Sequence, residues 1–149
     1  MSTFVVASDG SDSAQNAVDY CLELLSPEQH DIVAVYVAQK FPEEIEAVYL
    51  GGDTDLIELE QDVLEKAKDV LNQHVSDLRA AGFEVEVVTR LGTSGQEICK
   101  LARGRKAHGI IMGRQGRNAM TEALIGGTSH YVLHHAPCPV ILVPDENEE

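Results

Sequence analysis

The sequence predicts a single α/β domain built on a five-stranded, doubly wound parallel sheet of Rossmann-like type, with helices on both faces. The length of 149 residues suits one domain, and a hydrophobic content of 44% suffices for one core. Along the whole chain, short apolar runs rich in β-branched residues alternate with longer stretches of helical periodicity. This alternation favours parallel strands joined by right-handed crossovers. We assign residues 1–144 to this domain and residues 145–149 to an acidic tail.

Two strands and one helix are expected in the first quarter of the chain. Residues 3–9 form a short apolar run that leads into a helical stretch at 13–25, with Pro27 just beyond its end. Residues 31–38 are a run that is apolar at every position after Asp31, as expected of a strand that is covered on both faces. The 39–54 segment that follows contains an acidic patch and a glycine pair, and loops of this length in compact domains are usually functional.

A long amphipathic helix is predicted at 56–78, where apolar residues recur at three- and four-residue steps. His74 falls on the apolar stripe of this helix, which predicts a core or boundary histidine. Gly82 supplies the stop after the helix.

The second half of the chain continues the same alternation. Residues 83–90 alternate as a strand. Ser94 and Glu97 have the spacing of a capping box, which predicts a helix that begins there and runs to about Lys106. The remaining predicted elements are the strands 108–113 and 139–143 and the helix 128–135.

The composition excludes several partner classes. Twenty-five acidic residues against eleven lysines and arginines give a net charge of −14, so nucleic acid and anionic membrane surfaces would be repelled. No apolar run is long enough to cross a bilayer and the first residues lack the features of a signal peptide, so we expect a cytoplasmic protein without membrane insertion. Cys21, Cys99 and Cys138 are odd in number and far apart, which predicts reduced, mostly buried thiols.

In doubly wound sheets the ligand crevice lies beyond the carboxyl ends of the strands, where the strand order reverses. Two strand ends stand out in this sequence. The first strand ends in Ser8-Asp9-Gly10-Ser11-Asp12-Ser13, and the fourth ends in Gly113-Arg114-Gln115-Gly116-Arg117-Asn118. After the spacer 117–125, Gly126-Gly127-Thr128-Ser129 opens the last helix.

The fourth strand end combines the features of a phosphate site. Glycines permit unusual backbone angles and close approach of a ligand, and N–H groups at a helix N-terminus attract anions. Hydroxyl side chains add donors, and arginines add positive charge in an otherwise acidic chain. The residues involved are Gly113, Arg114, Gly116, Arg117, Gly126, Gly127, Thr128 and Ser129. Ordinary turns would also account for this segment, because short glycine patterns occur by chance.

The spacing G-x-x-G, nine residues, then G followed by a small residue resembles the nucleotide-binding signature of the ATP-binding branch of the universal stress protein family. VVASDGS resembles that family's first strand and turn, AHGIIMGRQG resembles its fourth strand, and HAPCPVILV resembles its last helix and strand. The similarity covers essentially the whole chain in order.

This resemblance implies that the protein binds ATP or a related adenine nucleotide and forms a homodimer through the last strand, Val140–Val143, whose edge needs a partner or cover. It places Val37 beside the adenine and Ala7, Ser8 and Asp9 beside the ribose. Around the phosphates it places Gly113, Gly116, Arg117, Asn118, Gly126, Gly127, Thr128 and Ser129.

Two positions carry open alternatives. Asp9 either contacts the ribose or a Mg²⁺ on the phosphates, or serves as a helix cap or turn residue. Gly127 stands where the family motif has Ser or Thr, so a hydroxyl contact to phosphate is lost or shifted, although the backbone N–H is retained. The sequence therefore predicts binding that is weaker or selective for a different nucleotide.

Three functions follow from these observations. The first is a nucleotide-responsive regulator in stress response, at most a weak ATPase, because no base lies near the glycine-rich segment, Glu122 is interpreted as a solvated loop carboxylate and His130 as a surface residue. The second is an ATP-pyrophosphatase-type adenylating enzyme, whose SGGxDS loop the first strand end resembles, although Asp9 would place a carboxylate against pyrophosphate. The third is a homodimeric interaction module without nucleotide that engages an unknown regulatory protein through the 39–54 loop.

Overall fold

The computed structural model describes residues 1–40, 53–114 and 126–144. Most of the predicted 39–54 loop and the acidic tail lie outside the described residues, as do Gly116, Arg117, Asn118 and Glu122. The strands are β1 (Ser2–Ala7), β2 (His30–Ala38), β3 (Val85–Leu91), β4 (Gly109–Gly113) and β5 (Val140–Val143). The helices are α1 (Asp12–Leu24), α3 (Asp53–His74), α4 (Ser76–Ala80), α5 (Ser94–Gly104) and α6 (Gly127–His135).

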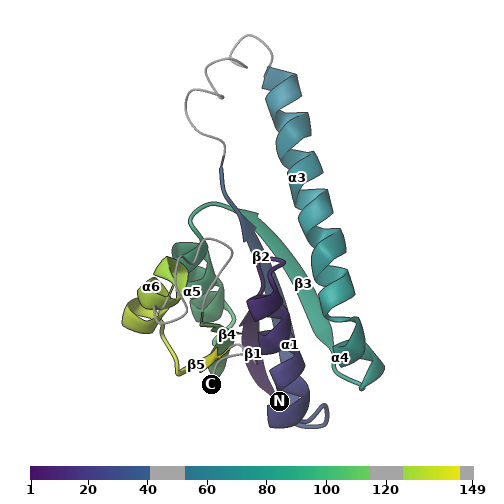
Figure 1. The fold of residues 1–149 in the computed structure, drawn as a ribbon, viewed down its shortest axis with the longest axis vertical. Helices are drawn as coiled ribbons and strands as arrows, with labels where there is room; N and C mark the ends of the chain where they lie inside the picture. Colours follow the sequence, from purple (N-terminus) through teal and green to yellow (C-terminus); the bar gives the residue numbers. More distant parts are fainter. Residues whose placement is uncertain (41–52, 115–125, 145–149) are drawn as a thin grey trace.

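The five strands form one parallel sheet with the order β3-β2-β1-β4-β5 (Figure 1). The chain builds outward from β1 to β3 and then crosses to the other side of β1 to build β4 and β5. The strand order therefore reverses between β1 and β4, which is the switch point where doubly wound sheets bind ligands. The predicted fold class is confirmed.

Helices cover both faces of the sheet, so the core has two layers. One buried cluster joins the sheet to α5 and α6 and includes Val5, Val33, Ile98, Ile110 and Val132. The other joins the opposite face to α1, α3 and α4 and includes Val6, Val18, Ala34, Leu71, Leu78 and Ile111. Because neighbours such as Val5 and Val6 belong to different clusters, the central strand β1 is apolar on both faces, whereas β3 also carries the exposed Glu86 and Arg90.

Two local predictions were wrong. The helix expected at 56–78 is interrupted at Val75, where the hydroxyl of Ser76 donates to the Gln73 carbonyl at 2.9 Å and so competes with the helical bonds. The capping box at Ser94 does not form, because Thr93 is the N-cap of α5 and makes no side-chain capping bond. The carboxylate of Glu97 instead pairs with Lys100 at 3.4 Å.

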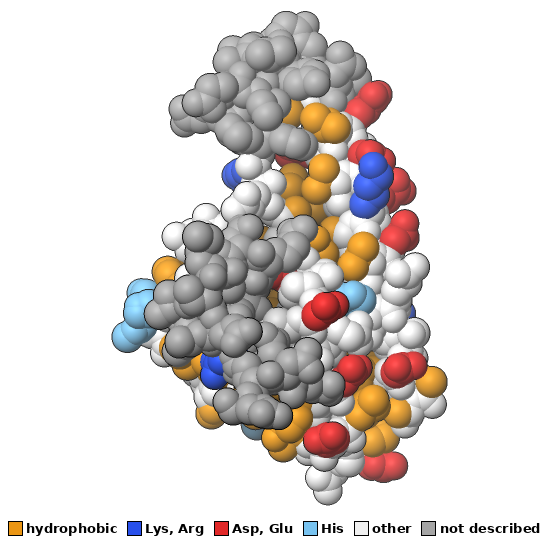
Figure 2. Space-filling view, in the orientation of Figure 1, with side chains coloured by type: hydrophobic (Ala, Val, Ile, Leu, Met, Phe, Trp, Pro, Cys, Tyr) orange, Lys and Arg blue, Asp and Glu red, His pale blue; other side chains and the backbone are white. Residues whose placement is uncertain are grey.

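The outer face of α3 is acidic (Figure 2). Glu58, Asp62, Glu65 and Asp69 are exposed and follow one another at four-, three- and four-residue steps along the helix. Residues at these spacings are neighbours on a helix, so their carboxylates repel one another. Lys66 relieves part of this repulsion through an ion pair with Asp62 at 3.3 Å.

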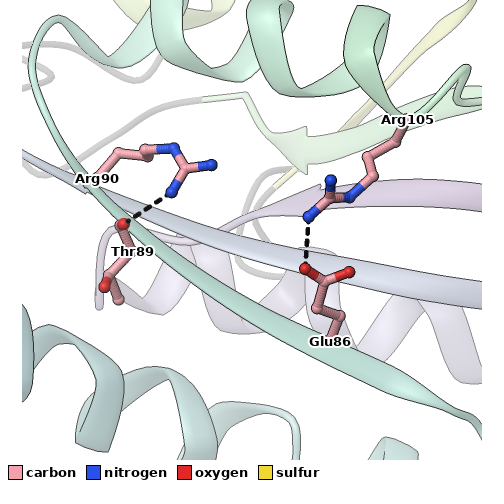
Figure 3. A network of polar contacts seen from close by, with 4 residues as sticks. All are labelled: Glu86, Thr89, Arg90 and Arg105. Carbon is pink, nitrogen blue, oxygen red and sulfur yellow. Dashed lines mark hydrogen bonds and ion pairs between the residues drawn. The ribbon is translucent and has the colours of Figure 1, made fainter.

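A surface ion pair joins α5 to β3 at the amino ends of the strands (Figure 3). The guanidinium of Arg105, the C-cap residue of α5, donates to the carboxylate of Glu86 in β3. Toward the carboxyl end of β3, Arg90 donates to the Thr89 carbonyl at 3.5 Å. Both partners of the ion pair are partly exposed, so it contributes at most about 1 kcal/mol to stability.

All three cysteines are free thiols. Burial raises the pKa of Cys21 to about 12, and burial also raises the pKa values of Cys99 and Cys138. Such thiols stay protonated at neutral pH and are weak nucleophiles. The prediction of buried thiols is confirmed for Cys21 and Cys99, whereas Cys138 is half-buried.

Candidate functional site

A cavity of about 480 Å³, counting space open to solvent, lies at the carboxyl ends of β1, β2 and β4. The N-terminal turns of α1, α5 and α6 complete its walls. The lining residues are Ala7, Ser8, Asp9, Ser11, Ala14, Val35, Val37, Ser94, Ile98, Met112, Gly113, Thr128 and Ser129. The structure thus brings together Ala7, Ser8, Asp9, Val37, Gly113, Thr128 and Ser129 from the predicted set.

The cavity is apolar on one side and polar on the other. Ala7, Val35, Val37, Ile98 and Met112 are all buried and supply the apolar surface. The polar groups come from the turns that follow the strands. An apolar slot with polar groups at its edge suits a flat ring that carries polar substituents.

The turn between β1 and α1 is held by its own side chains. The Asp9 Oδ1 atom accepts a hydrogen bond from the Ser11 N–H at 3.0 Å, and Ser11 Oγ accepts from the Ala14 N–H at 3.1 Å. Gly10 between them has a φ of +82°, which favours glycine. The turn interpretation of Asp9 is therefore confirmed, whereas the helix cap is Ser11.

Ser129 lines the cavity, but its hydroxyl is used in hydrogen bonds within the fold. Its side chain is buried, and its hydroxyl lies 3.0 Å from the Gly113 carbonyl and 3.1 Å from the Arg114 carbonyl. A hydroxyl has one proton, so these two acceptors already occupy the donor that was predicted to reach phosphate. Ser129 fastens the start of α6 to the end of β4.

Gly113 also has a structural reason to be glycine. A Cβ atom built there would lie 2.3 Å from Ser13 Oγ and 2.8 Å from the Ser13 carbonyl oxygen in α1. Its φ is not among the positive values found at described glycines, so Gly113 does not use the unusual backbone angles that glycine permits. The missing side chain lets α1 pack closely against the end of β4.

A second, more polar cavity adjoins the first and shares Ser94 and Thr128 with it. It is lined by Gln39, Lys40, Leu91, Gly92, Thr93, Ser94, Gly95, Gln96, Glu97, Lys100, Gly127, Thr128 and Tyr131. The first turns of α5 and α6 both open onto it. Among the described residues, neither the Thr93 cap of α5 nor the Gly126 cap of α6 makes a side-chain capping bond.

The two helix starts come together because of Gly95. A Cβ atom at Gly95 would lie 2.6 Å from the ring of Tyr131 in α6, so only glycine permits this approach. Partial positive charge from two helix N-termini therefore meets at one cavity, with Lys40 and Lys100 on its wall. Glu97 partly offsets this charge, because it lines the same cavity and pairs with Lys100.

The remaining predicted residues that the structure describes do not line the first cavity. Arg114 directly follows β4 but does not line the first cavity, and Gly126 is the N-cap of α6.

Within the part of the chain that the structure describes, no group of three or more His, Cys, Asp or Glu residues is placed to hold a metal ion. No described helix combines the length and apolarity that crossing a membrane requires.

Sequence reasoning missed several lining residues and one neighbour. Ser94 follows the third strand, so the rule that ligands bind beyond strand ends would have found it. His74 was interpreted as a core or boundary histidine, yet its Nδ1 atom lies 3.1 Å from Ser8 Oγ at the cavity. No local pattern signals this contact, because it depends on how α3 packs against the sheet, over β2 and β3.

The sequence of this chain is similar to those of known proteins. The sequence profile described as "Universal stress protein family" matches residues 1–144. The chain belongs to the universal stress protein family.

Individual relatives agree with this assignment over nearly their full length. Universal stress protein MJ0531 of Methanocaldococcus jannaschii is 25% identical to this universal stress protein over 97% of the chain and 83% of the relative. "Universal stress protein in QAH/OAS sulfhydrylase 3′region" of Thermus aquaticus is 30% identical over 95% of the chain and 97% of the relative. The solved structure of MJ0577 from Methanocaldococcus jannaschii superposes with a TM-score of 0.85 at 24% identity, covering 99% of this chain and 98% of that chain.

Proposed function

We propose that this universal stress protein binds an adenine nucleotide, ATP in the first instance, across the two adjoining cavities. The observation that carries the proposal is the junction of an apolar slot at the sheet's switch point with a cavity onto which two helix N-termini open. The adenine would lie against Val37 in the slot, and the ribose beside Ser8 and Asp9. The phosphates would extend past Thr128 into the second cavity.

The phosphate part of the proposal is supported by the backbone rather than by side chains. Gly127 begins α6, and a Cβ atom at this residue would meet nothing within 4 Å, so this side of the residue is open to a ligand. Because the Ser129 hydroxyl is committed to the end of β4, Thr128, which lines both cavities, is the better placed of the two neighbouring hydroxyl residues to contact phosphate. Gly116, Arg117 and Asn118 stay predicted phosphate residues.

Related structures support the choice of an adenine nucleotide. One universal stress protein structure is described as a complex with cAMP, and another, from Arabidopsis thaliana, has AMP bound. Each shares the fold of this chain with a TM-score of 0.64. Mg²⁺ would reach the site on the nucleotide phosphates, and Asp9 fits this role because Mg²⁺ commonly uses one protein carboxylate together with phosphate oxygens.

We further propose a regulatory rather than a catalytic role, with slow or no hydrolysis. Among the described residues that line the first cavity, Asp9 is the single ionisable group, and its Oδ1 already accepts from Ser11. Hydrolysis needs a group that orients water beside the terminal phosphate. Glu97 in the second cavity is paired with Lys100, which leaves it poorly suited to that task.

The proposal is tested by mass spectrometry of nucleotide released from freshly purified protein, followed by calorimetric titration with Mg-ATP, ADP, AMP and cAMP. Thr128→Trp should abolish binding because the ring would fill the junction of the cavities. Leu133→Trp is the matched control, since Leu133 is exposed on the same helix and should bind like the wild type. No released nucleotide and no heat with the wild type would instead favour an interaction module without nucleotide.

A homodimer through β5 is a second proposal. β5 is an edge of the sheet, and the carbonyls of Pro139 and Val143 accept hydrogen bonds from the N–H groups of Ile110 in β4 and Arg114 just after it. Backbone groups alternate in direction along a strand, so those of Val140 and Leu142 point to the open edge. Light scattering should give twice the chain mass for the wild type and the single mass for Val140→Pro, which removes one outward N–H. A wild-type monomer would overturn this proposal.

A further inference from the structure

Ser8 lines the first cavity and is also hydrogen-bonded to the last residue of α3. It directly follows β1, is only 5% exposed and lines the cavity. Its Oγ atom lies 3.1 Å from Nδ1 of His74, the last residue of α3. The Gly10 N–H donates to the same oxygen at 3.3 Å.

The hydrogen bonds of Ser8 define what it can offer to a ligand. A serine hydroxyl has one proton and two lone pairs, and Gly10 occupies one lone pair. A buried hydroxyl proton needs an acceptor, and among the described residues the acceptor within reach is Nδ1 of His74. Ser8 then keeps one lone pair for the cavity and has no proton left to donate.

We propose that His74 is a positioning residue whose Nδ1 accepts a hydrogen bond from the Ser8 hydroxyl. Ser8 is thereby left as a hydrogen-bond acceptor for a hydroxyl group of the ligand. The inference rests on the proposed function, in which the ribose lies beside Ser8. An acceptor at this point recognises a ribose hydroxyl and disfavours a deoxyribose that lacks it. His74 thereby confers selectivity for ribonucleotides without touching the nucleotide.

The first test examines His74 in the protein without nucleotide. The ¹⁵N chemical shift of Nδ1 separates a ring nitrogen that accepts a hydrogen bond from one that carries a proton. We expect His74 to show an unprotonated Nδ1 and a protonated Nε2, and the Nδ1 shift to change in Ser8→Ala. A protonated Nδ1 at neutral pH would overturn the proposal, because Ser8 would then be a donor.

The second test measures discrimination by calorimetry with ATP, 2′-deoxy-ATP and 3′-deoxy-ATP. The wild type should bind ATP about three- to tenfold more tightly than one of the two deoxy analogues, the effect expected of one hydrogen bond. His74→Leu should lose this preference by weakening ATP alone. His74→Asn should restore much of it, because the side-chain carbonyl can accept from Ser8.

A matched control and a thermal melt complete the design. His108→Asn changes an exposed histidine just before the amino end of β4 and should keep the wild-type preference. Melting of each variant establishes that it is folded. If His74→Leu keeps the wild-type preference, this inference fails while nucleotide binding stands. If the wild type binds no nucleotide, the proposed function fails and the inference fails with it.

Discussion

Gly113 and Ser13 are in such close contact that a methyl group on Gly113 would lie 2.3 Å from the Ser13 hydroxyl oxygen. This contact holds the start of α1 against the end of β4, beside the cavity. The glycine that resembles a ligand-binding glycine in sequence is therefore also a helix-packing glycine. A substitution of Gly113 therefore disturbs the packing of α1 against β4 as well as any ligand contact.

Gly113→Ala should destabilise the protein by about 1–3 kcal/mol, because the new methyl group meets backbone atoms of α1 that cannot yield cheaply. Urea unfolding measures the change. Gly104→Ala is the matched control, since nothing lies within 4 Å of a Cβ there, and alanine should be neutral or stabilising by up to about 1 kcal/mol. Equal stability of the two variants would contradict the packing argument.

Ser129→Ala should cost about 1–2 kcal/mol, since it removes the donor shared by the Gly113 and Arg114 carbonyls. Chemical denaturation gives the value. Ser76→Ala, which removes an exposed hydroxyl bonded to the Gln73 carbonyl, should change stability by less than about 0.5 kcal/mol. A Ser129→Ala variant that is as stable as Ser76→Ala would mean that Ser129 does not fasten α6 to β4.

Cys21 should make the protein less stable in alkali. Its pKa is raised from 9.0 to about 12 in the folded state, so its stabilising effect is complete below pH 9 and is lost as the pH rises toward 12. Between these values the unfolded thiol ionises while the buried thiol cannot, which lowers the unfolding free energy by about 1.4 kcal/mol per pH unit. Urea unfolding of the wild type and Cys21→Ala should show a steeper decline for the wild type. Parallel declines would contradict the prediction.

Salt should stabilise this universal stress protein. A net charge of −14 and the row of carboxylates on α3 oppose compactness, and ions screen such exposed repulsion. The melting temperature should rise as KCl increases from about 0.05 to 0.5 M, where the screening length shortens to a few ångströms. Glu65→Gln with Asp69→Asn should reduce the rise. A melting temperature that is independent of salt would show that repulsion is unimportant.

The architecture could be predicted because each strand carries its signal locally. Residues 32–38, for example, are apolar at consecutive positions, as expected of a strand covered on both faces. The rule that ligands bind beyond strand ends pointed to Ser8 and Asp9, and the family resemblance added Ala7 and Val37; all four line the cavity. The β1–α1 turn could likewise be predicted, because Asp and Ser side chains form hydrogen bonds with nearby backbone N–H groups.

The features that could not be predicted depend on contacts between distant elements. Ser129 resembles a phosphate ligand until the carbonyls of Gly113 and Arg114 are placed beside it. Gly95 gives no local signal, since its reason lies in the ring of Tyr131. His74 reaches Ser8 across 66 residues, a relationship that helical periodicity does not encode.

The central position of β1 also makes the site depend on pairing between distant parts of the chain. β2, the next strand in sequence, pairs with one edge of β1. The other edge of β1 waits for β4, whose Gly109, Ile110 and Ile111 pair with Phe4, Val5 and Val6. The start of α6, which closes the cavity, lies later still in the sequence. The cavity therefore cannot form before β4 has paired with β1 and α6 has packed, so a partly folded chain that has only its first strands in place has no pocket.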